Sequence, residues 1–138
     1  MNIRSARIDD QEALFNLYRV LSTKYEDDID SLKKALVHPT TEVFVLEEDS
    51  QLVGTATLSH RALPHYGLVG SIDDIVVDPH YRQRGFGTKL TVHCINVAKQ
   101  KGCKRIELTS RPFRTEANQM YTKLGFKQRE TNAYVLKI

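Results

Sequence analysis

The fold is decided by the stretch from Ser71 to Leu90, which reads SIDDIVVDPHYRQRGFGTKL. Its β-branched run at residues 75–77 predicts a buried strand, and Asp78-Pro79 ends that strand. A basic turn with two glycines follows, and the residues after the turn have the apolar spacing of an amphipathic helix. The stretch therefore predicts a strand, a loop and a helix, in that order.

The loop has the features of an anion site. Gly85 and Gly87 lack a Cβ atom, so the backbone can approach a ligand closely and point successive N–H groups into one concavity. The helix that begins there adds unpaired N–H groups and the positive end of its dipole, and Arg82, Arg84 and Lys89 add full charges. The spacing fits neither a P-loop nor a Rossmann turn. A phosphate or pyrophosphate is the expected ligand, and the alternative is a glycine-rich turn with a solvated basic rim.

The composition is that of one ordinary globular domain. We expect residues 1–138 to form a single domain, with 41% hydrophobic and 27% charged residues. The net charge of +3 is modest and the basic residues are scattered, which favours a small anion over nucleic acid as partner. Cys94 and Cys103 do not have metal-ligand spacing, so no metal site is expected. No apolar run is long enough to span a membrane, and we expect a cytoplasmic protein.

The rest of the chain predicts strands and helices both before and after the central stretch. The predicted strands cover residues 3–8, 42–47, 51–59, 73–77, 104–110, 126–129 and 132–137, and the predicted helices cover residues 11–21, 29–37, 86–101 and 115–124. Residues 60–67 are expected to form a loop. Gly54 within a predicted strand indicates a β-bulge or a close backbone approach.

A second motif stands in the last predicted helix, where Asn118 and Tyr121 precede Leu124-Gly125-Phe126. Together with Arg82-x-x-Gly85-x-Gly87 after the Asp-Pro stop, it resembles the GCN5-related N-acetyltransferases (GNAT). One departure from the family's usual pattern is Gln83-Arg84, where Arg/Lys-Gly or Gly-Lys often precedes the glycine pair. The resemblance implies an α+β fold in three layers. Its mixed, mostly antiparallel sheet of six to seven strands would carry about four flanking helices and a splayed central pair of strands.

The resemblance also implies acetyl-CoA as co-substrate. The pantetheine arm would lie in the gap between the splayed strands and pair with the main chain of Ile75, Val76 and Val77. The pyrophosphate would be held by Arg82, Gln83, Arg84, Gly85, Phe86, Gly87 and Thr88. Asn118 and Tyr121 would reach the cofactor from the last helix.

The implied chemistry is direct attack of a primary amine on the thioester, which needs a base for the ammonium and a donor for the departing thiolate. Tyr121 is the expected donor, and the alternative is a core aromatic residue. Asp73 is favoured as the base, with Asp74 or a water chain as alternatives. Strand alternation predicts that Asp73 and Asp74 point to opposite faces of the sheet.

The expected function is therefore an N-acetyltransferase that acts on an amine-bearing small molecule. A non-catalytic acyl-CoA binding module and a protein or peptide lysine acetyltransferase are the alternatives. The acidic segment at residues 23–30 is either a solvated connection or an attractor for a cationic amine. The resemblance also admits a homodimer formed through the last strands.

Overall fold

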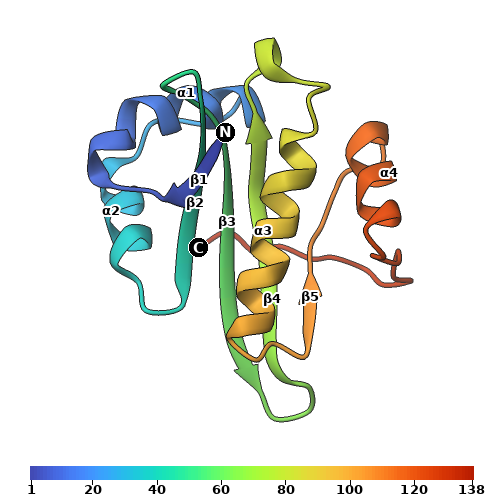
Figure 1. Ribbon diagram of the computed structural model, residues 1–138. Coiled ribbons are helices and arrows are strands. Elements are labelled where there is room, and N and C mark those ends of the chain that lie inside the picture. The colour runs from blue at the N-terminus through green and yellow to red at the C-terminus, as the bar shows by residue number, and fades with distance from the viewer.

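The computed structural model describes residues 1–138 and contains one five-stranded sheet in the order β1-β2-β3-β4-β5 (Figure 1). The strands are β1 (Asn2–Ser5), β2 (Thr41–Glu48), β3 (Gln51–Leu63), β4 (Gly67–Val77) and β5 (Arg105–Glu107). Strands β1 to β4 are antiparallel to their neighbours, and β5 is parallel to β4. The prediction of a mixed, mostly antiparallel sheet is confirmed.

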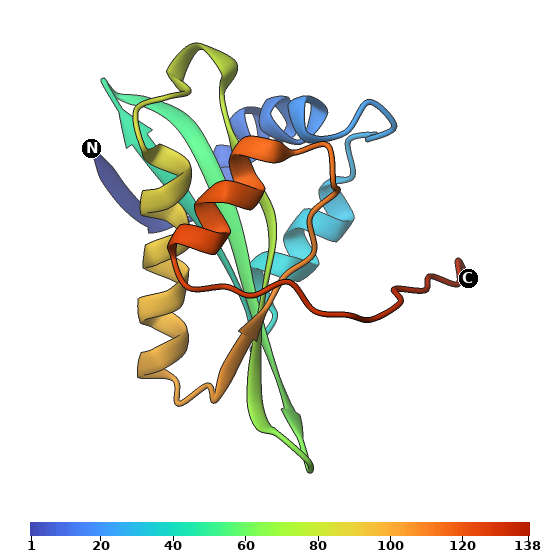
Figure 2. The same ribbon diagram turned by 90° about the vertical axis from the view of Figure 1, so that its right-hand side faces the viewer.

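Helices cover both faces of the sheet, which gives three layers (Figures 1 and 2). The helices are α1 (Gln11–Leu21), α2 (Ile29–Val37), α3 (Phe86–Gln100) and α4 (Thr115–Lys123), and short 3-10 helices lie at Ile8–Asp10 and Pro79–Tyr81. One core lies under α3 and includes Phe44, Leu46 and Leu90. The second core lies under α1 and α2 and includes Leu14 and Val45. The central sheet thus separates two cores.

The strand count differs from the prediction of six to seven. Residues 126–129 and 132–137 form no strand, so that part of the prediction is wrong for the isolated chain. The predicted loop at residues 60–67 is also wrong, because β3 and β4 continue as paired strands as far as Leu63 and Gly67. The first predicted strand ends earlier, at Ser5, and the 104–110 strand is reduced to Arg105–Glu107.

Gly54 lies beside a β-bulge and also at a close approach of the backbone, the two features that the sequence indicated as alternatives. The register between β2 and β3 shifts beside it, since Leu46 pairs with Gly54 while Glu47 pairs with Leu52. A Cβ atom on Gly54 would lie 3.0 Å from Leu90 Cδ1 and 3.3 Å from the Val76 carbonyl oxygen. The glycine therefore lets β3 pass close beneath α3.

The central strands diverge, as predicted. Strand β5 pairs with β4 only over Val69–Ser71, and the following residues of β4 have no neighbour on that side. The chain after β5 runs away from β4 to α4 (Figure 1). A free backbone edge therefore extends along β4 from Ile72 to Val77. None of the helices is both long and apolar enough to cross a bilayer.

Candidate active site

The loop between β4 and α3 is held in a fixed conformation by its first residues. The Asp78 N–H donates to the Val53 carbonyl at 2.8 Å, and the Asp78 carboxylate accepts from the His80 N–H at 2.8 Å. Gln83 and Gly85 then adopt positive φ angles of 63° and 77°, and Gly85 is the N-cap of α3. These two left-handed residues turn the chain sharply into the helix.

The main-chain N–H groups of residues 82–88 are unbonded. None of them donates to a backbone carbonyl or to a side chain, and the first helical bond here is from the Lys89 N–H to the Gly85 carbonyl at 3.0 Å. A Cβ atom on Gly85 would meet nothing within 4 Å, so the space in front of the loop is open. Unpaired amides at the N-terminus of a helix of fifteen residues form a strong anion-binding arrangement.

The basic side chains of the loop are arranged around its outer surface. Arg82 Nε donates to the Val77 carbonyl at 3.4 Å, and the Arg84 guanidinium lies 4.9 Å from the ring centroid of Tyr81. Lys89 Nζ lies 5.6 Å from the ring centroid of Phe86. The Phe86 side chain is buried in the core under α3, so only its main chain is available to a ligand.

The β4 residues predicted to meet pantetheine present only their main chain. The side chains of Ile75 and Val77 pack against the core under α3, and Val76 is buried. Because β5 has separated from β4 at this level, the backbone edge of Ile75, Val76 and Val77 is free to pair with an extended ligand.

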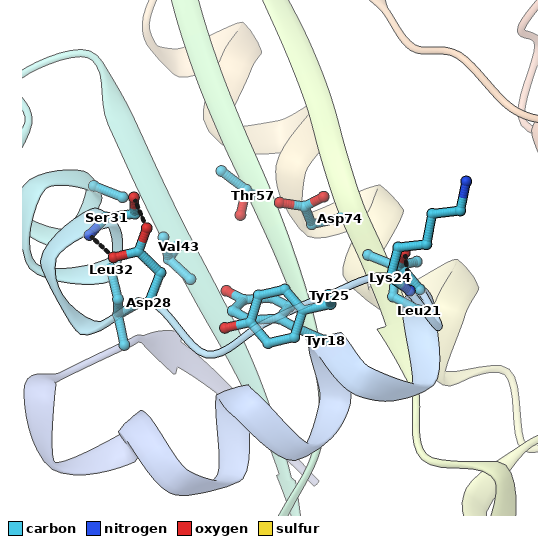
Figure 3. Close-up of a pocket in the computed structure, with 12 residues that line it drawn as sticks. Tyr18, Leu21, Lys24, Tyr25, Asp28, Ser31, Leu32, Val43, Thr57 and Asp74 are labelled. Atoms are coloured by element: carbon cyan, nitrogen blue, oxygen red, sulfur yellow. Dashed lines mark hydrogen bonds between the residues drawn. The ribbon is translucent and has the colours of Figure 1, made fainter. Parts of the chain in front are cut away.

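A β-bulge brings both central carboxylates to one face of the sheet. Thr55 pairs with Val76 and Thr57 with Asp73, so β4 carries an extra residue here, and Asp74 has a φ of 54°. Cross-strand partners share a face, which puts Asp73 on the same face as Thr57. Asp74 also lies beside Thr57 (Figure 3). The prediction of opposite faces is wrong, because the bulge interrupts the alternation.

Asp74 opens into a pocket of about 400 Å³ between α1, α2 and the sheet (Figure 3). Its walls are mostly apolar or aromatic, with hydroxyl and carboxylate groups at intervals. The lining residues are Tyr18, Leu21, Ser22, Lys24, Tyr25, Asp28, Ser31, Leu32, Ala35, Val43, Thr57 and Asp74. Asp73 is not among them, and it accepts a hydrogen bond from Ser71 Oγ at 3.1 Å.

The surroundings of Asp74 disfavour the charged form of its carboxyl group. Burial raises the pKa of the Asp74 carboxyl, and the negative charge of Asp73 raises it further. Burial, with a smaller effect of Asp74, raises the pKa of Tyr18 to about 12. Asp28 caps α2 by accepting from the Ser31 N–H at 3.0 Å and from Ser31 Oγ at 2.7 Å. These bonds lower the pKa of Asp28, which therefore stays ionised.

The second motif lies on α4, whose Met120 approaches the loop between β4 and α3. Met120 Sδ on α4 would be 3.7 Å from a Cβ on Gly87. Burial raises the pKa of the neighbouring Tyr121, so that its phenol is protonated at neutral pH. The Tyr121 and Phe126 rings pack edge to face, with their centroids 5.9 Å apart. Asn118 Nδ2 donates to the Arg111 carbonyl at 3.1 Å, so this amide holds the preceding loop.

Sequence reasoning missed most of the pocket. Tyr18 belongs to the apolar stripe of α1 and reads as a core residue, and Tyr25 lies in a polar connection. Their rings lie 5.5 Å apart and form one wall of the pocket (Figure 3). Two signals of this site were present in the sequence: Asp74, an alternative candidate for the base, and the acidic residues at 23–30, of which Asp28 lines the pocket whereas Asp27 pairs with Arg19. No group of three or more His, Cys, Asp or Glu could hold a metal ion.

The structure combines a loop of unbonded N–H groups at the start of α3, a free strand edge beside it and a pocket with two carboxylates on the opposite face of the sheet. A model of the acetyltransferase (GNAT) family matches residues 7–126. The chain therefore belongs to this family of acetyltransferases.

Relatives of known name differ in their acceptors. A glucosamine 6-phosphate N-acetyltransferase from Trypanosoma brucei brucei is 35% identical over 65% of this chain and 60% of its own length. An aminoalkylphosphonate N-acetyltransferase from Salmonella typhimurium is 25% identical over 91% of this chain and 84% of its own length. Among solved structures, an aminoglycoside N-acetyltransferase in complex with CoA has a TM-score of 0.86 at 23% identity, covering 99% of this chain and 93% of its own. That likeness concerns the fold.

Proposed function

We propose that this chain transfers the acetyl group of acetyl-CoA to the primary amine of a small molecule that enters the pocket beside Asp74. The observation that carries the proposal is the set of unbonded N–H groups at residues 82–88 around the open space at Gly85. A pyrophosphate satisfies such donors well. The free backbone edge of β4 next to the loop also supports the proposal, because an extended pantetheine arm can pair with it as an added strand would.

Acetyl-CoA would supply the thioester, whose carbonyl carbon is attacked by the amine lone pair while the C–S bond breaks and the CoA thiol is released. Asp74 would accept the proton of the incoming ammonium, directly or through water. Its raised pKa makes it a better base for this purpose than an ordinary aspartate. Tyr121, protonated in its partly buried position, would donate to the departing sulfur.

The lining of the pocket favours a cationic acceptor without a phosphate group. Two carboxylates, Asp28 and Asp74, line it together with one ammonium group, that of Lys24. The Lys24 side chain points away from Asp74 (Figure 3). A phosphorylated amine would meet net negative charge here, whereas two tyrosine rings and two carboxylates attract a cation. Two of the acetyltransferases named above have a phosphorylated or phosphonate amine as acceptor, so they are in this respect an imperfect guide.

The test is a thiol-release assay with acetyl-CoA and a library of primary amines. The library should pair each phosphorylated amine with its phosphate-free analogue, and we expect turnover with phosphate-free cationic amines. Gly85→Asp should abolish acetyl-CoA binding in calorimetry, because a carboxylate would enter the ring of amides at a position with a φ of 77°. The matched control is Gly102→Asp, which has a φ of 87° and equally open surroundings but lies at the other end of α3.

The outcomes separate the candidate functions. Unchanged acetyl-CoA affinity in Gly85→Asp would remove the proposed cofactor site. Tight binding of acetyl-CoA without turnover of any amine would favour the non-catalytic module. Turnover of peptide lysines alone would favour the protein acetyltransferase, and a preference for phosphorylated amines would contradict the proposed acceptor.

A further inference from the structure

Helix α4 carries Tyr121 but is held to the rest of the protein by few contacts. None of its residues is buried. The backbone hydrogen bonds of residues 108–126 are all local, such as that from the Phe126 N–H to the Tyr121 carbonyl at 3.0 Å. Strand β5 pairs with β4 only over Val69–Ser71, so no strand pairing holds the chain that follows it. The position of Tyr121 therefore depends on a small number of side chains.

One hydrogen bond connects this segment with a distant part of the chain. Arg114, the residue before α4, donates from Nη2 to the Leu21 carbonyl at 3.3 Å, so the first turn of α4 lies beside α1 (Figure 2). Leu21 is the last residue of α1, and the final carbonyl groups of a helix have no partner within it. A guanidinium satisfies such a carbonyl, and the helix dipole favours its charge there. Arg114 therefore ties the start of α4 to the end of α1.

The bond joins the two sides of the candidate active site. Leu21 lines the pocket beside Asp74, and so do two of the three residues that follow it. On the other side, burial raises the pKa of Tyr121, and the positive charge of Arg114 acts against this rise. The guanidinium thus lies within electrostatic reach of the phenol. One side chain links the wall of the acceptor pocket with the expected donor.

No carboxylate competes for Arg114. Its side chain is partly buried, and it forms no ion pair. Arg111, in the same loop, has an exposed side chain without a hydrogen bond or an ion pair, although its carbonyl accepts from Asn118. The two arginines therefore differ in the bond to α1 and not in charge, which makes Arg111 a matched comparison.

We propose that Arg114 is a positioning residue for the acetyl transfer, which holds α4 against α1 so that Tyr121 faces the amine that enters beside Asp74. This role rests on the function proposed above. The amine is held between α1, α2 and the sheet, whereas the donor is on α4, so their separation depends on what joins these elements. A displacement of about 1 Å between reacting groups can cost about a hundredfold in rate.

The first test compares Arg114→Ala with Arg111→Ala, which removes the same charge from the same loop. Arg114→Ala should lower kcat about tenfold, because Tyr121 would no longer be held at the acceptor pocket. Its affinity for acetyl-CoA in calorimetry should change less than about twofold, since the loop at residues 82–88 is untouched. Arg111→Ala should change neither value. A loss in Arg114→Ala confined to the KM of the amine would overturn the proposal, because Arg114 would then contact the amine itself.

The second test asks whether Arg114 acts through Tyr121. In a Tyr121→Phe background, Arg114→Ala should lower kcat less than about threefold further, since the donor that it positions is already absent. Additive losses in the double variant would overturn the proposal, because Arg114 would then act independently of Tyr121.

The third test needs no substrate. Amide hydrogen exchange in α4 should be at least about fivefold faster in Arg114→Ala than in the natural chain, while exchange in α3 stays the same. Unchanged exchange in α4 would overturn the proposal even if activity fell. If the natural chain turned over no amine, the function proposed above would fail, and this role with it. Turnover by the natural chain without any loss in Arg114→Ala would leave that function standing and overturn only the role of Arg114.

Discussion

At the residue scale, the function depends most on which carboxylate serves the incoming amine. Asp74 lines the pocket, whereas Asp73 lies outside it and bonds to Ser71. We predict that Asp74→Asn lowers kcat/KM for the amine by about a hundredfold or more, in the range of a lost general base. Asp73→Asn should cost less than about tenfold. Steady-state kinetics at saturating acetyl-CoA measure both, and a larger loss in Asp73→Asn would reverse the assignment.

The same pair gives a prediction for pH dependence. The pKa of Asp74 is raised first by burial and then by Asp73, so activity should fall as the pH drops through this raised pKa. Removing the negative charge in Asp73→Asn should move the acidic limb of the kcat/KM profile to lower pH. A carboxyl group whose pKa is raised by folding contributes stability that is fully present below its ordinary, unfolded-state pKa. That contribution is lost as the pH rises through the raised pKa of the folded state. Asp74→Asn should therefore fold at least as stably as the natural chain at pH 7, so an inactive variant would not be an unfolded one.

Tyr121 gives a second residue-scale prediction. Its phenol is protonated at neutral pH and is suited to donate to a departing thiolate. We expect Tyr121→Phe to lower kcat about tenfold while the KM for acetyl-CoA changes less than about twofold. Tyr66→Phe, in the exposed turn of the β3-β4 hairpin, is the matched control and should change neither value. Equal losses in kcat and in acetyl-CoA affinity would make Tyr121 a packing residue.

Residues differ in how far the sequence reveals their roles. The place of Gly85 at the turn into α3 was predictable, since a glycine pair after an Asp-Pro stop is typical of a tight turn into a helix. The presence of Asp74, and not Asp73, in the pocket was not predictable, because it depends on a bulge whose only trace in the sequence is two adjacent aspartates. Asp74 adopts a left-handed φ, which aspartate tolerates better than most residues, but this preference is too weak to locate a bulge.

At the scale of elements, Gly54 controls how closely β3 approaches α3. We predict that Gly54→Ala lowers the free energy of unfolding by about 1–3 kcal/mol, because the added methyl group meets both Leu90 and the backbone of Val76. Gly70→Ala is the control, since its Cβ would meet Cys103 Sγ at an ordinary 3.5 Å. Urea denaturation measures both. A cost for Gly70→Ala as large as that for Gly54→Ala would show that the close approach is not the cause.

The elements that sequence reasoning predicted well are those with local signals. Helix α2 was predicted with the bounds that it has, because Leu32, Ala35 and Leu36 lie on one face of the helix and Pro39 follows its end. The hairpin of β3 and β4 was predicted too short, since residues 60–67 contain two histidines and a proline and look like a loop. The strands predicted at 126–129 and 132–137 failed for a different reason. Strand propensity describes a segment, but pairing requires a second strand that the isolated chain does not place beside it.

At the scale of the whole molecule, the two cores are joined through shared strands. In β2, Val43 and Val45 face the core under α1 and α2, whereas Phe44 and Leu46 face the core under α3. Loss of either core would therefore expose one face of β2, whose other face is part of the remaining core. This arrangement supports the prediction that residues 1–138 are a single domain, because a domain unfolds as one cooperative unit.

Cooperative unfolding can be tested with one truncation in each core. Leu14→Ala and Leu90→Ala both remove a side chain that is 0% exposed, and each should cost about 2–5 kcal/mol of unfolding free energy. The amide NMR signals of Leu17 in α1 and Cys94 in α3 should disappear at the same urea concentration, in the natural chain and in both variants. If Leu14→Ala lowered the midpoint for Leu17 but left that for Cys94 unchanged, the two faces would be separate folding units. The pocket beside Asp74 would then be able to open while the loop between β4 and α3 stayed folded, since the pocket lies on the face of α1 and α2 and the loop leads into α3.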